Sequence, residues 1–450
     1  MTGKHDPTQP IAAHHSRWRA AAVLTLIASI AFGHALLRMP YAGFNPDESR
    51  WISRAHYLAD ILDPFGPTWD DRYATRGQPP VGSYLTGIGL LVQGRDLATN
   101  GPWDFSIPGA EGWQHNIDVG NMPVPADLSA ARRFNAALVA LTAIVVALIA
   151  RRVAGPVAGV VAGMLFALHP FSAYIGSIAT SDAGFGLSIA LAALVAGRLA
   201  AHPSTGSAIV LGALLGLGGG TKLSPLVTAV LLGGYGIALL AGAALRRQPW
   251  QADRLGWALA ATPFIAALAF IGSYPYLWPD PVGRTRNLVE FRTEEMRQQS
   301  ADWPVMAVPN RAEALRRVGI NFGERFSVLG MAGQGVAALT GHPIAPPPLE
   351  LAAALAGGLI WLAAAIRAGP RSPTSLMLML LAGQVAVTIG GMRSEFDRYH
   401  VPMALLGSVA LGVAAAIVAP PIATGWRRLR SVPARKVAER ESRGAPARVE

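Results

Sequence analysis

The chain alternates between long apolar runs and basic or polar connections, most of which are short. The first run covers residues 20–37, and others follow at about 132–150, 153–171, 183–200, 207–221, 223–245, 255–274, 351–367, 373–391 and 400–420. A helix needs about 20 apolar residues to cross a bilayer, and most of these runs approach that length, although 207–221 is short. The pattern predicts an all-α polytopic membrane protein with about ten transmembrane helices.

One further apolar run, residues 79–93, is interpreted differently. It is short for a span, opens with Pro79-Pro80 and contains several glycines. We expect a re-entrant or interfacial helix that does not cross the membrane. If it did cross, Arg151-Arg152 would lie on the outer side and the charge pattern would invert downstream.

Basic residues indicate the orientation of the spans. With the N-terminus in the cytoplasm, the cytoplasmic segments hold Arg151-Arg152, Arg198, Arg246-Arg247, Arg254, Arg367, Arg371 and the tail from Arg427. This is the distribution that the positive-inside rule requires. We therefore expect a cytoplasmic tail at 1–19, a membrane domain at 20–420 and a basic cytoplasmic tail at 421–450. Two large extracytoplasmic loops with juxtamembrane helices follow, at about 38–131 and 275–350.

Composition supports this class of protein. Hydrophobic residues make up 52% of the chain and charged residues only 14%, whereas about 25% is usual in soluble proteins. The net charge of +11 resides mostly in short loops and the tail, so it indicates membrane orientation and we expect no nucleic-acid partner. The absence of cysteine excludes thiol catalysis, disulfides and cysteine metal sites.

Two adjacent carboxylates follow the first span, in Phe44-Asn45-Pro46-Asp47-Glu48-Ser49-Arg50-Trp51. One interpretation is a helix start, since Asn45 can cap, Pro46 fits the first helical position and acidic residues suit the positive end of the dipole. The other is a catalytic site at the membrane surface. The two are compatible, because a capped helix holds a carboxylate rigidly.

Three other charged places fall on the same side of the membrane. They are Asp182 in Ala179-Thr-Ser-Asp-Ala-Gly184, Lys222 in Thr221-Lys-Leu-Ser-Pro225, and the segment Arg393-Ser-Glu-Phe-Asp-Arg-Tyr-His400. Their structural interpretations are an N-cap, a snorkelling lysine and an aromatic-basic anchor. Ionisable groups at span ends are also candidate functional groups. Carboxylates can act as bases towards a hydroxyl, and Lys and Arg can hold a phosphate, so together they suggest group transfer from a lipid phosphate.

Several segments, in order, resemble motifs of one enzyme family. Pro46-Asp-Glu-Ser-Arg50 resembles its Asp-Glu loop, and Thr221-Lys222 its Thr-Lys-Gly-Pro turn. The other matching segments are Arg76-Gly-Gln-Pro-Pro-Val-Gly82, Ala131-Arg-Arg-Phe-Asn135, Ala179-Thr-Ser-Asp-Ala183 and Phe396-Asp-Arg-Tyr-His-Val-Pro402. The set is similar to GT-C glycosyltransferases of the family 39-like protein O-mannosyltransferase and aminoarabinose-transferase type, over about residues 20–420. Gln78 departs from this pattern, because it stands where the family has the lysine of Lys-Pro-Pro, and Asn135 and Ser181 also differ.

The resemblance implies transfer of a hexose or pentose from a polyprenyl-phosphate-linked donor to a protein, lipid or glycan acceptor. It implies a site facing outward from a bacterial plasma membrane. Asp47 would act as the base or position the nucleophile, with Glu48 and Asp182 organising acceptor and sugar. The residues expected to bind substrate are Arg50, Arg76, Gln78, Lys222, Arg398 and Tyr399. Lys222 and Arg398 would hold the lipid phosphate, with Arg76 a substitute for the missing lysine. One carboxylate pair is too few ligands for us to assign metal-binding residues. Whether a divalent cation acts as cofactor is left open.

Two other functions remain open from the sequence. A flippase or transporter of lipid-linked sugars would carry polar residues through the middle of several spans, whereas the charges here gather at one face. A non-catalytic subunit of the same fold is separated from a transferase only by an activity measurement.

Overall fold

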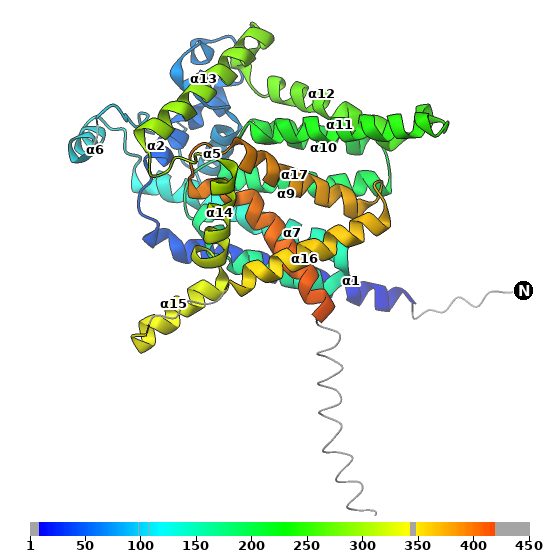
Figure 1. Ribbon diagram of the computed structural model, residues 1–450. Coiled ribbons are helices and arrows are strands. Elements are labelled where there is room, and N and C mark those ends of the chain that lie inside the picture. The colour runs from blue at the N-terminus through cyan, green and yellow to red at the C-terminus, as the bar shows by residue number, and fades with distance from the viewer. Residues whose placement is uncertain (1–8, 98, 108, 343–347, 419–450) are drawn as a thin grey trace, which may run out of the picture.

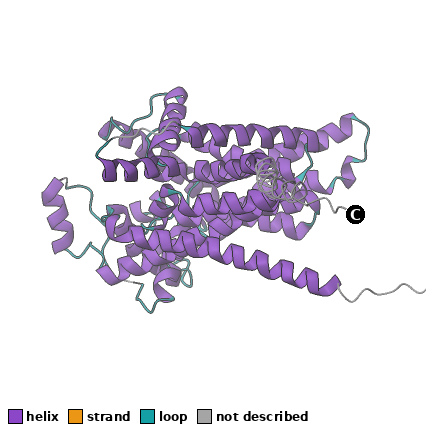
Figure 2. Ribbon diagram, turned by 90° about the horizontal axis from the view of Figure 1, so that it is seen from below, coloured by secondary structure: helices purple, strands orange, loops and turns teal. Residues whose placement is uncertain are grey.

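The computed structural model describes residues 9–418 apart from 98, 108 and 343–347. In this part of the chain every regular element is a helix, and the only β contact is an isolated bridge between Ala307 and Ser394. Figure 2 shows the helices joined by loops, with no strand. The first part of the tail expected at 1–19 lies outside the described residues, while its residues 9–19 belong to the helix α1 (Gln9–Arg38). The tail expected at 421–450 lies wholly outside the described residues.

The helices of the membrane bundle account for every expected span. They are α1 (Gln9–Arg38), α7 (Pro125–Leu168), α9 (Asp182–Ala201), α10 (Thr205–Gly219), α11 (Ser224–Leu245), α12 (Arg254–Gly272), α16 (Leu349–Ala368), α17 (Pro373–Gly391) and a final span, Asp397–Val418. Within the described residues eight helices are long and apolar enough to cross a membrane, and α10 is a shorter apolar helix. The chain is a multi-pass integral membrane protein.

The longest helix, α7, is two antiparallel arms. Its 44 residues contain a break at Ala154 and Gly155, where Gly155 has a positive φ of 88° that glycine adopts readily. Pro156 then starts the second arm. The arms pack closely against each other: a Cβ added to Gly159 would lie only 2.8 Å from the carbonyl oxygen of Ala147. This helix therefore supplies the two spans expected at 132–150 and 153–171.

The remaining helices are shorter and gather at one end of the bundle. They are α2 (Pro46–Ser53), α3 (Tyr57–Asp60), α4 (Tyr73–Gly77), α5 (Val81–Leu91), α6 (Gly109–Asp118), α8 (Pro170–Gly176), α13 (Pro281–Asp302), α14 (Arg311–Ile320) and α15 (Val328–Thr340). Single turns complete this end: η1 (Met39–Tyr41), η2 (Arg54–His56), η3 (Pro67–Trp69), η5 (Pro275–Leu277), η6 (Asn321–Arg325) and η7 (Asp397–His400). The other end carries η4 (Trp250–Ala252).

We call the end that carries the two long connections the loop end of the bundle. In Figure 1 it lies at the left, with α2, α6, α13 and α14, while the short turns between spans lie at the right. The helix α5 belongs to the loop end and has only 11 residues, about 16 Å of helix. It is too short to cross a bilayer, as expected for the run 79–93.

Small side chains allow the spans to pack closely. The core is rich in alanine, and Gly216 of α10 faces the backbone of α12, where a Cβ would lie 2.4 Å from the carbonyl oxygen of Ala266. Such contacts are typical of membrane helices, where packing replaces the hydrophobic effect between helices. The resulting rigid bundle supports the elements at the loop end.

Candidate active site

The helix α2 begins with the cap expected from its sequence. The side chain of Asn45 accepts a hydrogen bond from the Asp47 amide at 3.0 Å, and the Asn45 amide donates to Glu48 Oε2 at 2.9 Å. Pro46 occupies the first turn. Capping satisfies backbone donors that a helix start leaves free, so the Asp47 carboxylate projects from a fixed backbone.

Glu48 faces away from Asp47 and is fully buried. Its carboxylate accepts from Arg132 Nε at 2.7 Å, from Arg132 Nη2 at 2.6 Å and from the Ala179 amide at 2.7 Å, besides the Asn45 amide. Four hydrogen bonds occupy the usual acceptor sites of a carboxylate. Glu48 therefore ties α2 to α7 and to the segment before α9, and the role expected for it in organising substrate is not supported by its placement.

The charged segments expected from the sequence meet in a polar pocket of about 370 Å³ at the loop end. The pocket is lined by six of the nine expected site residues: Asp47, Gln78, Asp182, Lys222, Arg398 and Tyr399. They come from α2, the segment before α5, the start of α9, the turn between α10 and α11, and η7. Segments as far apart in sequence as Asp47 and Arg398, which 351 residues separate, thus share one cavity.

Two ion pairs form a chain of alternating charge in the polar pocket. The Arg398 guanidinium donates to Asp47, and the Lys222 ammonium contacts the carboxylate of Asp182. Lys222 also donates to the backbone carbonyl of Arg398 at 3.4 Å and lies 4.9 Å from the ring centre of Tyr399. With Arg292, the lining has three cationic and two acidic side chains, so an added anion finds a net positive charge.

The 3-10 turn η7 fixes Arg398 and Tyr399. Arg325 donates to the Asp397 carboxylate through Nη1 at 2.7 Å and through Nη2 at 2.9 Å. On the other side the buried His400 lies 3.0 Å from Glu395 through Nε2. Bidentate arginine pairs restrict geometry as well as adding energy, so both ends of this turn are held.

The acidic residue of α9 is held by the segment that precedes it. Asn135 of α7 is buried and donates to the carbonyl oxygens of Ile178 and Thr180, both at 2.7 Å. The Thr180 hydroxyl then donates to Asp182 at 2.7 Å. Asn135, a departure from the family pattern, therefore positions Asp182 through the backbone.

The environment shifts the pKa values of Asp47 and Lys222. Burial raises the pKa of Asp47, but the charge and hydrogen bond of Arg398, with Arg50 and Arg54 behind, outweigh it and hold that pKa below its usual value. Burial lowers the pKa of the Lys222 ammonium, and Asp182 offsets this only in part. Asp47 is accordingly ionised at neutral pH.

Gln78 is oriented by a residue that the sequence analysis did not select. Arg54, which is buried, donates to the side-chain oxygen of Gln78. Because a guanidinium can only donate, the oxygen of Gln78 is taken and its amide nitrogen remains to face the pocket. The only sequence signal for Arg54 is its place one helical turn after Arg50.

Arg292 and Met296 were also missed, and they line the polar pocket from α13. The sequence predicts a solvated or interfacial surface helix here, with many opposite charges, and Arg292 does pair with Glu295. Which face of such a helix covers a pocket depends on how the long loop folds, and no local pattern encodes that.

Two expected substrate-binding arginines do not line the pocket. Arg50 donates to the Trp103 carbonyl at 3.3 Å and stacks on Phe105 at 4.2 Å. Arg76 pairs with Asp71 at 2.8 Å. Arg76 therefore does not replace the family's lysine, and Gln78 itself stands at that place in the lining.

Among the described residues no three His, Asp or Glu side chains come together in a way that could hold a metal ion. A divalent cation cofactor therefore remains an open question, as it was from the sequence.

The helical fold of the chain is similar to that of solved membrane enzymes with the GT-C fold. The archaeal oligosaccharyltransferase AglB from Archaeoglobus fulgidus, solved with an inhibitory peptide and a dolichol-phosphate, matches 97% of this chain with a TM-score of 0.51 and 14% identity. ArnT from Cupriavidus metallidurans, solved with undecaprenyl phosphate, matches 87% of it with a TM-score of 0.50 and 17% identity. At such identities the likeness shows the fold.

Residues 126–272 of the chain match the family model of dolichyl-phosphate-mannose-protein mannosyltransferases. The resemblance stated from the motifs is thus confirmed by the family model over these residues and by the fold over nearly the whole chain. The chain spans only about half the length of the solved structures it matches, 53% of AglB and 59% of ArnT. No curated protein matches it by sequence.

Proposed function

We propose that this protein is a glycosyltransferase that moves a sugar from a polyprenyl-phosphate-linked donor to an acceptor on the extracytoplasmic side of the membrane. The observation that carries the proposal is the meeting of Asp47, Lys222 and Arg398 in one polar pocket at the loop end. The GT-C fold supports it, and so do the lipid phosphates bound by AglB and ArnT.

In the proposed reaction an acceptor hydroxyl attacks the anomeric carbon of the sugar. The new carbon–oxygen bond forms as the bond to the phosphate oxygen breaks, and the electron pair leaves with the phosphate. The Asp47 carboxylate takes the hydroxyl proton. Proton transfer to a positioned base typically speeds a reaction by about 10²–10⁴. Lys222, Arg398 and Arg292 stabilise the charge that develops on the phosphate.

Asp182 and Gln78 complete the proposed site. Asp182 holds Lys222 in place through their ion pair, so it positions the ammonium group for the phosphate. The Gln78 amide nitrogen offers neutral donors to the phosphate. The sugar is a hexose or pentose, and the acceptor is a protein, a lipid or a glycan.

The test is sugar transfer in proteoliposomes supplied with polyprenyl-phosphate sugars and a membrane extract as acceptor source. We expect Asp47→Asn to reduce the transfer rate by about 10²–10⁴. The matched control is Asp70→Asn, since Asp70 is exposed, pairs only with Arg72 on the surface and does not line the pocket. Equal transfer by Asp47→Asn and wild type would remove Asp47 from the reaction. A wild type that moves the lipid-linked sugar across the bilayer without transferring it would identify a flippase.

A further inference from the structure

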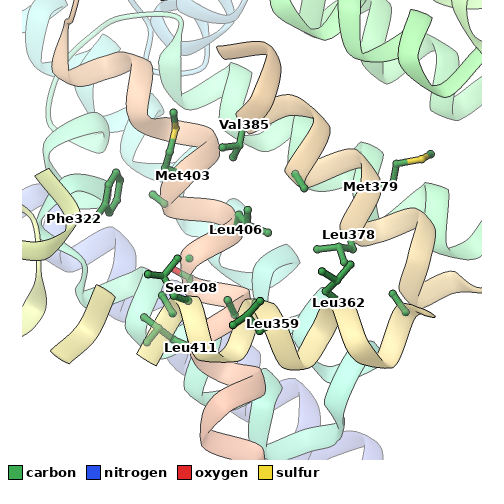
Figure 3. Close-up of a pocket in the computed structure, with 18 of the residues that line it drawn as sticks. Phe322, Leu359, Leu362, Leu378, Met379, Val385, Met403, Leu406, Ser408 and Leu411 are labelled. Carbon is green, nitrogen blue, oxygen red and sulfur yellow. The ribbon is translucent and has the colours of Figure 1, made fainter. Parts of the chain in front are cut away.

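A second, larger cavity lies among the spans. It measures about 1010 Å³ and is lined by α16, α17 and the final span, Asp397–Val418. Figure 3 shows Leu362, Leu378 and Leu406 pointing from these three helices into a common space. Its lining is apolar except for His169, Tyr235, Glu350, Ser375 and Ser408. We call it the apolar cavity.

The apolar cavity opens towards the membrane and is distinct from the polar pocket. Leu355, Leu359 and Ile366 of α16 line it and are exposed on the outer surface of the bundle. It shares no lining residue with the polar pocket, because α17 turns Val385 towards the cavity and Thr388 towards the pocket. A molecule in the cavity therefore enters from the lipid.

Two glycines leave the apolar cavity open. A Cβ on Gly358 or on Gly407 would meet no atom within 4 Å, and both residues line the cavity. The adjacent Gly357 differs, since its Cβ would lie 1.9 Å from the carbonyl oxygen of Ala410. Protein interiors hold few voids larger than a water molecule, and a large apolar void binds apolar guests rather than water. Hydrocarbon is the material available to fill it.

His169 gives the loop end of the apolar cavity a specific polar group. Its Nδ1 accepts a hydrogen bond from the Phe171 amide at 3.2 Å, as the cap of α8. The proton of the neutral ring must then be on Nε2. Nε2 lies 3.9 Å from Glu350 Oε1, a separation that one bridging oxygen atom can span.

We propose that the apolar cavity binds the hydrocarbon chain of a neutral lipid alcohol, whose hydroxyl accepts a hydrogen bond from His169 Nε2 and donates one to the Glu350 carboxylate. A carboxylate has about four acceptor sites; the Val328 amide donates to Oε2, and the hydroxyl would approach Oε1, the oxygen nearer His169. A phosphate-headed lipid fits poorly, because no Lys or Arg lines the cavity and its charge would face Glu350. The site does not depend on the proposed sugar transfer.

The experiment measures binding of two probes to the purified full-length protein in detergent. The probes are radiolabelled geranylgeraniol, a C20 prenol, and geranylgeranyl phosphate. We expect saturable binding of the alcohol that Gly358→Leu or Gly407→Leu reduces to background, because the Cβ at either position has open space and the longer side chain fills part of the cavity. Gly242→Leu is the matched control, since Gly242 of α11 is equally open and lines neither cavity.

The variant His169→Asn tests the head group. Asparagine is a good helix cap, so α8 keeps its start while the Nε2 donor is lost, and alcohol affinity should fall on the order of 10-fold. Lys222→Ala should leave alcohol binding unchanged. The proposal is overturned if the phosphate binds as tightly as the alcohol at this cavity, or if Gly358→Leu and Gly407→Leu, melting as the control does, retain alcohol binding.

Discussion

The Asp47 carboxylate and the Arg398 guanidinium neutralise one another in the polar pocket. Each is also the group that the proposed reaction uses, one as base and the other as phosphate ligand. A donor phosphate would be a second anion beside Arg398 and would weaken its hold on Asp47. The ion pair therefore couples donor binding to the basicity of Asp47, since less influence from Arg398 means a higher pKa.

The coupling predicts a shift in the pH profile of Arg398→Gln. Without the main charge that lowers it, the pKa of Asp47 rises towards the value that burial favours. The base acts only when ionised, so the acid limb of kcat/KM should move to higher pH than in the wild type. Transfer rates measured across pH 4–9 check this, and Arg286→Gln, an exposed pair partner of Glu290, is the control. An unmoved acid limb would mean that another group titrates there.

At the scale of the element, α2 shows what a local pattern can and cannot predict. Its cap was predicted from Asn45, Pro46 and the two acids, because these interactions join neighbours in sequence. The division of labour between Asp47 and Glu48 was not, because successive helical residues point about 100° apart. Which direction meets the pocket and which meets α7 depends on how α2 packs. The role of Arg292 on α13 was not predicted for the same reason, since it depends on which face of α13 packs over the pocket.

The tie between α2 and α7 predicts a large stability effect. Glu48→Gln would leave the Arg132 guanidinium buried without its carboxylate, and breaking a buried pair typically costs about 3–5 kcal/mol. The midpoint of thermal unfolding in detergent should therefore fall clearly. Glu290→Gln, which breaks an exposed pair with Arg286, should change it little. The double variant Glu48→Gln/Arg132→Gln should lose less than the sum of the single variants, and additive losses would argue against the pair.

At the scale of the whole molecule, most of what the sequence predicted followed from the alternation of the spans between the two sides of the membrane. Once run 79–93 was assigned to one side, the alternation required the four charged residues Asp47, Asp182, Lys222 and Arg398 to lie at the same end. All four line the polar pocket at the loop end. Distances across that end were beyond the pattern, since packing of α4, α5 and α13 sets them. The hairpin in α7 was predictable, because Arg151-Arg152 separates two apolar runs.

The orientation of the bundle yields a prediction that needs no activity. The arginine-rich turns lie opposite the loop end, so the positive-inside rule puts the loop end outside the cytoplasm. The chain contains no cysteine, so a single introduced thiol is the only one to react. Leu62 at the loop end and Leu245 at the other end are both highly exposed. In intact cells a membrane-impermeant maleimide should label Leu62→Cys and spare Leu245→Cys, which reacts only after permeabilisation. The reverse pattern would put Asp47 in the cytoplasm and would exclude a donor presented in the outer leaflet.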